Sequence, residues 1–519
     1  MRLELRGVTK RFPGVVANDH IDLTVDEGEI HALLGENGAG KTTLMNILYG
    51  LYRADEGELL IDGEPTHFDT PGDAIKAGLG MVHQHFMLVP VFTVTENVIL
   101  GTESVGRFGL LDGRAAARHV AETSERYGLH VPVDAVIEDL PVGVQQRVEI
   151  VKALYREAEV LILDEPTAVL TPQESEELFD VMRSLRAAGK SIIFITHKLK
   201  EVLAIADRIT VMNRGQVVGS TTPEETSEQE LAAMMVGRAV KLTMDKTPAA
   251  PGETVLEIRD LKARDDRGQM AVDGVSLDVH AGEIVCIAGV QGNGQTELVE
   301  AVMALRPAAA GSMGLLGREL ASASPKSVIG GGVGHVPEDR QRDGLVIDFS
   351  VADNMVLNTY DQPPFAHWIV RDADEVREAA QERAEAFDVR TWTVEQAAVT
   401  LSGGNQQKVI VAREFSRPIK LLVASQPTRG LDVGSIEYIH RRIIEKRDEG
   451  TAVLIVSVEI DEVMALADQI AVMFRGRIVD ILPAETAVRE QIGLLMAGSG
   501  GDTTTRAASP DAAEGVRGA

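Results

Sequence analysis

Short apolar runs alternate with amphipathic stretches along most of the chain. Residues 160–164 (VLILD) and 191–196 (SIIFIT) have the length and aliphatic character of strands that are buried on both faces. Between them, residues 173–189 (QESEELFDVMRSLRAAG) place apolar side chains at helical spacing. The alternation predicts an α/β fold built around a mixed, largely parallel sheet.

The second half of the chain repeats the first. GEIHALLGENGAGKTTLMNIL begins at residue 28 and GEIVCIAGVQGNGQTELVEAV at residue 282, an offset of 254 that also relates Gln84 to Glu338. From residue 140 onward the offset is 261, which relates Asp164 to Ser425. A constant offset over this length predicts a tandem duplication. We expect a first domain at 1–240, a linker at 241–253, a second domain at 254–498 and a disordered tail at 499–519.

Composition narrows the class of protein. The 519 residues include 44% hydrophobic and 25% charged residues, which suits two globular domains. The formal net charge of −28 argues against a nucleic-acid partner. The single cysteine, Cys286, lies in a strand-like run and is expected to be a core residue rather than a nucleophile. No apolar run reaches the ~20 residues of a membrane helix, and no signal peptide is evident, so we expect a cytosolic chain that another protein anchors if it works at a membrane.

A glycine-rich segment lies between a predicted strand and a predicted helix. GENGAGKTT, residues 35–43, fits the pattern G-x-x-x-x-G-K-[ST]. Such a loop turns backbone N–H groups toward phosphates, and the helix that follows adds its positive end. We expect Lys41 to reach the β- and γ-phosphates of ATP and the Thr42 hydroxyl to hold Mg²⁺. The candidate nucleotide-binding residues here are Gly35, Glu36, Asn37, Gly38, Ala39, Gly40, Lys41, Thr42 and Thr43.

Polar side chains stand at the ends of the two buried strands. Asp164 ends the first and is suited to holding Mg²⁺, while Glu165 is suited to polarising a water for attack on the γ-phosphate. His197 follows the second strand, where it is a candidate donor to the γ-phosphate. A structural histidine is the alternative for His197.

The segments GENGAGKTT, Gln84, LSGGNQQ (401–407), LILDEP (161–166) and His197 resemble, in this order, the ATP-binding subunits of ABC transporters. The resemblance covers nearly the whole chain and implies two nucleotide-binding domains, each with a helical subdomain. In that family the domains pack head to tail, and each ATP lies between the Walker A loop of one and the LSGGQ-type signature of the other. The resemblance adds Gln84 as a catalytic and Mg²⁺-binding residue. It also adds Phe12 as an adenine-stacking aromatic, for which a core role is the alternative.

Crossing the two halves in this way implies one complete ATP site and one incomplete site. The complete site joins the residues above to the signature and the D-loop of the second half. Its expected residues from that half are Ser402, Gly403, Gly404, Asn405 and Asp432.

The other site collects substitutions at the positions that carry chemistry. Gln295 replaces the lysine, Ser425 and Gln426 replace the two carboxylates, and Val458 replaces the histidine. The opposing segment, LPVGV, has a proline and a valine within the signature. We therefore expect ATP turnover at one site only. The remaining substitutions are Pro141, Val142 and Thr171.

The fused halves with an impaired second loop resemble the ATPases of bacterial simple-sugar importers, and ASQPTRGLD (424–432) resembles the nucleoside-importer branch. The resemblance implies two membrane permeases as partners, an extracytoplasmic binding lipoprotein served indirectly, and a peripheral place on the cytoplasmic side of the membrane. Residues 86–94 are a candidate permease seat or, alternatively, core. The alternatives are a sugar importer, a soluble twin ATPase acting on ribosomes or in repair, and a regulatory subunit without turnover.

Overall fold

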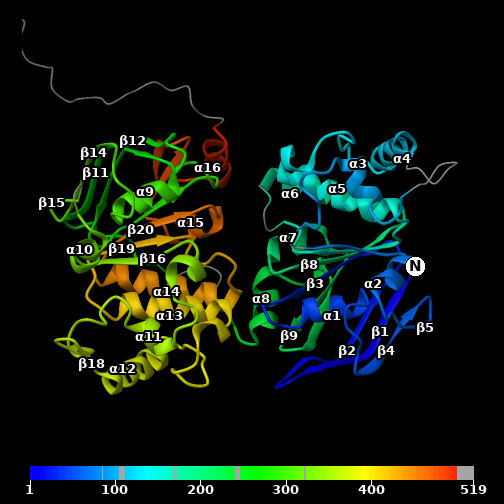
Figure 1. The fold of residues 1–519 in the computed structure, drawn as a ribbon, viewed down its shortest axis with the longest axis horizontal. Helices are drawn as coiled ribbons and strands as arrows, with labels where there is room; N and C mark the ends of the chain where they lie inside the picture. Colours follow the sequence, from blue (N-terminus) through cyan, green and yellow to red (C-terminus); the bar gives the residue numbers. More distant parts are fainter. Residues whose placement is uncertain are drawn as a thin grey trace, which may run out of the picture. The chain divides into compact units, whose positions relative to one another are not determined.

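The computed structural model of the chain describes residues 1–83, 86–103, 112–167, 170, 172–239, 246–320 and 323–498. It divides into two compact units (Figure 1). Unit 1 comprises Met1–Leu242 and Asp432–Gly434, and unit 2 comprises Thr243–Leu431 and Ser435–Ala519. The predicted tail at 499–519 lies outside the described residues, as does the first part of the predicted linker, residues 241–245.

The main sheet of unit 1 is largely parallel, as predicted. Five strands run parallel, and a sixth closes one edge in the antiparallel direction. Both strands predicted from apolar runs have the expected bounds. In sheet order the strands are β6 (Leu79–Val82), β7 (Val160–Asp164), β8 (Ser191–Thr196), β3 (Ile30–Gly35), β9 (Arg208–Asn213) and β10 (Gln216–Thr221).

A second, antiparallel sheet and eight helices among the described residues complete unit 1. This sheet has the order β2 (Val15–Val25), β1 (Leu3–Phe12), β4 (Glu56–Ile61) and β5 (Glu64–Thr66). Within unit 1, helices α3, α4 and α5 gather at the end away from this sheet and form the helical subdomain (Figure 1). The helices are α1 (Lys41–Leu48), α2 (Pro71–Lys76), α3 (Val94–Ile99), α4 (Gly113–Arg126), α5 (Val142–Tyr155), α6 (Pro172–Ala187), α7 (Leu199–Ile205) and α8 (Glu228–Val236).

Unit 2 repeats both sheets in the same strand order. Its main sheet is β16 (Val333–Val336), β19 (Leu421–Ser425), β20 (Ala452–Ser457), β13 (Ile284–Ala288), β21 (Gln469–Phe474) and β22 (Arg477–Pro483). The antiparallel sheet is β12 (Met270–His280), β11 (Thr254–Arg264), β14 (Ala310–Leu315) and β15 (Arg318–Glu319). A hairpin, β17 (Ala366–His367) and β18 (Val370–Arg371), lies beside the helical subdomain made of α11, α12 and α13 (Figure 1). The helices are α9 (Gln295–Val302), α10 (Pro325–Gly330), α11 (Val351–Met355), α12 (Ala373–Ala386), α13 (Gly403–Phe415), α14 (Val433–Asp448), α15 (Ile460–Leu466) and α16 (Arg489–Met496).

The parallel strands of both main sheets are almost wholly apolar because helices and the antiparallel sheet cover their two faces. In unit 1 the strands β3, β7 and β8 are buried at every position. Cys286 lies in β13 and is fully buried, so it is a core residue as predicted. The repeated strand order confirms the tandem duplication. Each main sheet brings the carboxyl ends of its parallel strands to one edge, which is where α/β sheets hold their ligands.

Candidate functional site

The glycine-rich loop of unit 1 connects β3 to α1 and is shaped by a close backbone contact. Gly40 has a φ of 98°, and a Cβ atom at this residue would lie 2.2 Å from the carbonyl oxygen of Ala17. Only glycine fits such a position. The turn places Lys41 at the first position of α1 with 6% of its surface exposed. Its Nζ atom donates to the carbonyl oxygens of Gly35 at 2.7 Å and Glu36 at 3.0 Å, so the lysine lies against the inside of its own loop.

Two carboxylates lie near this lysine. Burial lowers the pKa of Lys41, while the negative charges of Glu165, Asp164 and Glu36 oppose the shift. Asp164 ends β7 with 9% of its surface exposed. Burial and the adjacent charge of Glu165 raise the pKa of Asp164 to about 6, although Lys41 acts in the other direction. A buried cation therefore lies near a buried and a half-buried carboxylate at one edge of the sheet.

Glu165 and His197 form a direct pair. The Nδ1 atom of His197 lies 2.9 Å from Oε1 of Glu165, and the two side chains are 21% and 14% exposed. Burial is the largest influence on the Glu165 pKa and would raise it, but His197, Lys41 and Lys198 together lower it below the ordinary value. Because an ionised carboxylate only accepts hydrogen bonds, Nδ1 of His197 carries the proton. His197 thus holds the carboxylate of Glu165 in place.

A further, half-buried acid that belongs to none of the motifs lies behind this pair. Glu201 in α7 accepts a hydrogen bond from Thr167 at 2.7 Å and lies 3.2 Å from Lys198. Lys198 in turn donates to the carbonyl oxygen of Thr167 at 3.2 Å. These contacts tie the turn after Glu165 to the turn after His197. The only signal in the sequence is an acidic residue in the first turn of a short helix, which is too common to be diagnostic.

Other predicted residues of unit 1 are placed less centrally or lie outside the described residues. Phe12 ends β1 with 37% of its surface exposed, and its ring contacts Tyr52 edge-to-face at 5.5 Å, so the alternative of a core phenylalanine is wrong. Thr42 is exposed in the first turn of α1. Gln84 and Thr171 lie outside the described residues.

Unit 2 keeps the loop but replaces the cation with an amide. Gly294 has a φ of 99°, and a Cβ atom there would lie 2.1 Å from the carbonyl oxygen of Ala271, just as in unit 1. Gln295 donates from Nε2 to the carbonyl oxygen of Val290 at 3.0 Å and accepts at Oε1 from the N–H of Asn293, also at 3.0 Å. Gln295 therefore accepts a hydrogen bond from a loop N–H group and, unlike Lys41, brings no positive charge to the loop.

The acidic positions of unit 2 are also changed while the backbone is conserved between the copies. Ser425 ends β19 and Gln426 follows it, with 6% and 8% of their surfaces exposed. Gln426 donates from Nε2 to Oε1 of Glu338 at 2.9 Å, so the amide serves a different partner from its counterpart Glu165. Val458, at the position of His197, brings no titratable group.

The two signature segments also differ in the hydrogen-bond donors that they offer, but here unit 2 has the donors and unit 1 lacks them. Ser402 caps α13, and Nδ2 of Asn405 donates to its Oγ atom at 2.9 Å, which leaves the hydroxyl proton of Ser402 available to an outside acceptor. Gly403 and Gly404 form the first turn, where backbone N–H groups have no partner within the helix. In unit 1, Pro141 begins α5 without a side-chain cap, and Val142 is 43% exposed.

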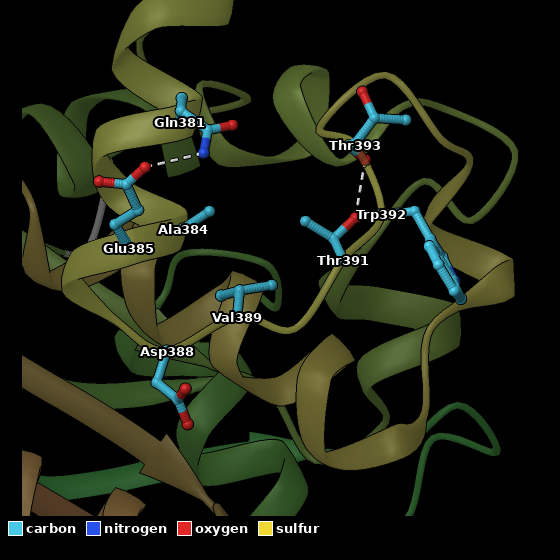
Figure 2. A pocket seen from close by; sticks show the side chains of 8 residues that line it. All are labelled: Gln381, Ala384, Glu385, Asp388, Val389, Thr391, Trp392 and Thr393. Atoms are coloured by element: carbon cyan, nitrogen blue, oxygen red, sulfur yellow. Dashed lines mark hydrogen bonds between the residues drawn. The ribbon is translucent and has the colours of Figure 1, made fainter.

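A surface pocket of about 220 Å³ lies elsewhere in unit 2, beside the end of α12 (Figure 2). Its polar lining groups are paired with one another, since Gln381 donates to Glu385 at 2.9 Å and Thr391 donates to the carbonyl oxygen of Thr393 at 2.7 Å. Trp392 borders it with 97% of its surface exposed, and Trp368 in the neighbouring hairpin is 94% exposed. None of the predicted nucleotide-binding residues lines this pocket.

Two features were sought and not found in the described part of the chain: a membrane-spanning helix and a cluster of metal ligands. None of its helices combines the length and the apolar character that crossing a bilayer requires. Within the same residues, no group of three or more histidine, cysteine or acidic side chains is arranged to hold a metal ion.

Comparison with known proteins gives consistent matches. The family model for the ABC transporter matches residues 18–168 and 272–429, one match in each half. The nucleoside import ATP-binding protein NupA of Lactococcus lactis subsp. cremoris is 52% identical over 96% of this chain and 98% of its own length. The guanosine import ATP-binding protein NupO of Bacillus subtilis is 49% identical over 96% and 97%, and the glucose import ATP-binding protein TsgD13 of Haloferax volcanii is 49% identical over 98% and 97%. The similarity thus extends over both halves of the chain.

Proposed function

The chain belongs to the ABC transporter family, and on that premise we propose that it is the ATPase subunit of an importer that takes up nucleosides. The observation that carries this proposal is the difference between two matching backbones. Unit 1 gathers Lys41, Asp164, Glu165 and His197 at one edge of its sheet. Unit 2 keeps the same turns and has lost each of these side chains. One half therefore has the groups that phosphoryl transfer requires, and the other half does not.

In unit 1, each group has a role that follows from its surroundings. Lys41 and the loop N–H groups bind the phosphates of ATP, for which a buried cation against a helix start is well suited. Glu165 orients the attacking water, since its pKa lies below the ordinary value and the carboxylate is ionised at neutral pH. His197 fixes that carboxylate through Nδ1. While Nδ1 donates to Glu165, Nε2 of a neutral ring is only an acceptor, so donation from Nε2 to the γ-phosphate requires a protonated ring.

The donor chemistry around Asp164 fits Mg²⁺. Asp164 and Thr42 offer oxygen ligands, which Mg²⁺ prefers, and both stand beside the phosphate-binding loop. The pKa of Asp164 is raised to about 6 by burial and by Glu165, so a cation at this place would favour its ionised form. When bound, Mg²⁺ supplies positive charge that offsets the charge of the β- and γ-phosphates. Gln84 remains a proposed further ligand.

The signature of unit 2 is proposed to complete this site. Ser402 offers a hydroxyl proton, and the first turn of α13 offers backbone N–H groups to a γ-phosphate. Asp432, in the loop after β19, and Phe12, exposed at the end of β1, are the proposed D-loop and adenine contacts. The converse site would combine Gln295 with Pro141, and we propose that it does not hydrolyse ATP.

The importer requires partners that this chain does not contain. We propose that it sits peripherally on two membrane permeases, at the cytoplasmic side, and that a binding lipoprotein outside the cell delivers the cargo. The segment 86–94 supports a permease seat because Met87 and Val91 are 64% and 69% exposed, as a docking surface requires. Nucleosides are favoured as cargo by the names of two relatives with 52% and 49% identity, and the glucose importer with 49% keeps a sugar as the second candidate.

Reconstitution of the complete importer tests this proposal. The full chain is purified with its permeases and lipoprotein, and ATP hydrolysis is measured with nucleosides or simple sugars added. We expect nucleosides, and not sugars, to stimulate hydrolysis. Stimulation by sugars alone would replace the cargo, and recovery of the chain with ribosomes or DNA instead of permeases would contradict an importer altogether.

A further inference from the structure

The segment Pro337–Arg340 (PEDR) of unit 2 connects three elements that the sequence keeps far apart. It follows β16 directly, and Asp339 caps the helical turn Arg340–Gly344 by accepting from the N–H groups of Gln341 and Arg342, each at 3.0 Å. This cap fixes the backbone of the segment. Two side chains of the segment, Glu338 and Arg340, then contact the loop that contains Arg429 and differ in their second contact.

Glu338 reaches the glycine-rich loop of unit 2 and the turn after β19. Its Oε1 atom accepts from Gln426 at 2.9 Å and from Gln291 at 3.1 Å, and it pairs with Nη1 of Arg429 at 2.6 Å. Its Oε2 atom lies 3.5 Å from the hydroxyl of Thr296. One carboxylate therefore joins the loop of unit 2, the position of the lost catalytic glutamate and the loop that leads to Asp432.

Arg340 reaches the same loop and the signature. Its Nη1 atom donates to the carbonyl oxygen of Arg429 at 3.0 Å. Its Nη2 atom would lie 2.7 Å from a Cβ atom at Gly403, so the guanidinium group lies directly against the signature glycine. Its Nε atom is buried without a hydrogen-bond partner among the described residues. Arg340 is half-buried, and leaving its buried Nε–H group unpaired is unfavourable, so stability alone does not explain this arginine.

The signature helix is tied to the same loop by a further bond. Gln407 in α13 donates from Nε2 to the carbonyl oxygen of Pro427 at 2.8 Å, and Gln341 donates to Oε1 of Gln406 at 3.1 Å. The beginning of α13 and the loop 427–431 are thus held by one network that starts at the PEDR segment.

Unit 1 keeps the glutamines of the signature helix but lacks the two arginines and the signature glycine of this network. By the offsets of the duplication, Phe86 stands at the position of Arg340, Ala168 at that of Arg429 and Val142 at that of Gly403. The arginine and the bare glycine therefore occur together in the half with the intact signature. Neither occurs in the half with the degenerate signature.

We propose that Glu338 and Arg340 are positioning residues for ATP hydrolysis: they hold the signature and the loop leading to Asp432 in the geometry that the competent site uses. This inference rests on the proposed function, because the signature of unit 2 must serve the ATP bound to unit 1. It gives the degenerate loop of unit 2 a role as an anchor for catalytic elements rather than as a nucleotide site.

The test compares variants of the full chain. R340A removes the guanidinium group. R340K keeps the positive charge, but an ammonium group cannot contact Arg429 and Gly403 at the same time as the guanidinium does. E338Q keeps the shape of the side chain and removes its negative charge. R342A is the matched control, since the Arg342 side chain is 83% exposed and its nearest acid is Asp343 at 3.8 Å. Turnover, equilibrium binding of ATP and the melting temperature are measured for each.

We expect R340A to lower turnover about 10- to 100-fold, as small misplacement of a catalytic element does. ATP binding should stay within about twofold, because Lys41 and its loop are untouched, and this separation is not expected from a purely structural defect. R340K should fall between wild type and R340A, and E338Q should also lose turnover.

Turnover of R340A equal to that of R342A would overturn the inference. If R340A does not fold, E338Q decides, and wild-type turnover in E338Q would overturn it. E165Q separates the two levels of the argument: full activity in E165Q refutes the proposed function itself, whereas loss in E165Q with normal R340A and E338Q refutes only the positioning role.

Discussion

Glu165 and Gln426 adopt the same left-handed backbone conformation, with φ angles of 46° and 44°. Each donates its backbone N–H to the neighbouring strand, Glu165 to Ile195 at 2.9 Å and Gln426 to Val456 at 2.7 Å. Positive φ is unfavourable for residues other than glycine, so the surrounding fold imposes this turn in both units. The turn is therefore a property of the fold, and the chemistry depends on the side chain alone.

Exchange of the side chain at these two positions should consequently have unequal effects. We expect E165Q to reduce ATP turnover by about 100-fold or more, because it removes the carboxylate that orients the water and leaves the backbone intact. Q426A should change turnover less than about twofold. Steady-state ATPase assays of the two purified variants check this, and similar losses in both would refute the model with one active site.

Lys41 and Gln295 begin the helices that follow the two glycine-rich loops. Replacing each of them should distinguish a residue that binds nucleotide from one that only stabilises its loop. K41M removes the buried cation and should weaken ATP binding by about 10- to 100-fold, the loss expected for hydrogen bonds to a charged group. Q295M removes the bonds to Val290 and Asn293 and should lower the free energy of unfolding by about 1–3 kcal/mol with ATP binding unchanged. Isothermal titration and urea unfolding measure the two quantities. A large loss of ATP binding in Q295M would show that the second loop binds nucleotide.

The glycine before each of these residues should matter equally in the two units. A Cβ atom at Gly40 or Gly294 would lie 2.2 or 2.1 Å from a carbonyl oxygen, and both residues have a φ near 100°. G40A and G294A should each destabilise the protein by more than about 1 kcal/mol. Thermal melting measures this effect, and only G40A should also impair ATP binding. Wild-type stability in G294A would contradict the assignment of a shared backbone requirement.

His335 makes unit 2 sensitive to acid. Burial lowers its pKa to about 4, although Glu414 opposes the shift, and its Nε2 atom is buried without a partner among the described residues. The unfolded chain binds this proton near pH 6.5 and the folded chain only near pH 4, so stability falls as the pH drops between these values, by up to ~3 kcal/mol.

The counterpart of His335 in unit 1 is Met81, which suggests the variant H335M. We expect the urea midpoint of the wild type to fall more than that of H335M when the pH is lowered from 7 to about 4.5. M81H in unit 1 serves as the reciprocal control and should introduce a new loss at acid pH. Equal pH dependence of wild type and H335M would exclude His335 as the cause.

Features that depend on local sequence were predictable. The strands at 160–164 and 191–196 have the predicted bounds. Continuous apolar runs of this length are typical of parallel strands that are buried on both faces. The helix predicted at 173–189 is observed as Pro172–Ala187. The glycine-rich loop, the two carboxylates and the histidine of unit 1 each end or follow a parallel strand of one sheet. They come together because the carboxyl ends of such strands lie at the same edge.

Features that depend on side-chain reach were not predictable. Glu338 and Arg429 are 91 positions apart, and nothing in the local pattern of either indicates a pair. Glu201 contacts Thr167 from 34 positions away, across two strand ends. The pairing of His197 with Glu165 was not predicted either, although it leaves Nε2 of the ring free for the proposed contact with the γ-phosphate. These contacts follow from the fold rather than from periodicity or motif.

The two tryptophans, Trp368 and Trp392, are the only ones in the chain, and both are almost fully exposed in the helical part of unit 2. Intrinsic fluorescence therefore reports on the solvent around one subdomain and is nearly blind to unfolding of either core, so denaturation is better followed by circular dichroism. The same property makes the indoles a built-in optical probe: a partner that covers this surface should shift their emission to shorter wavelength, with no label attached.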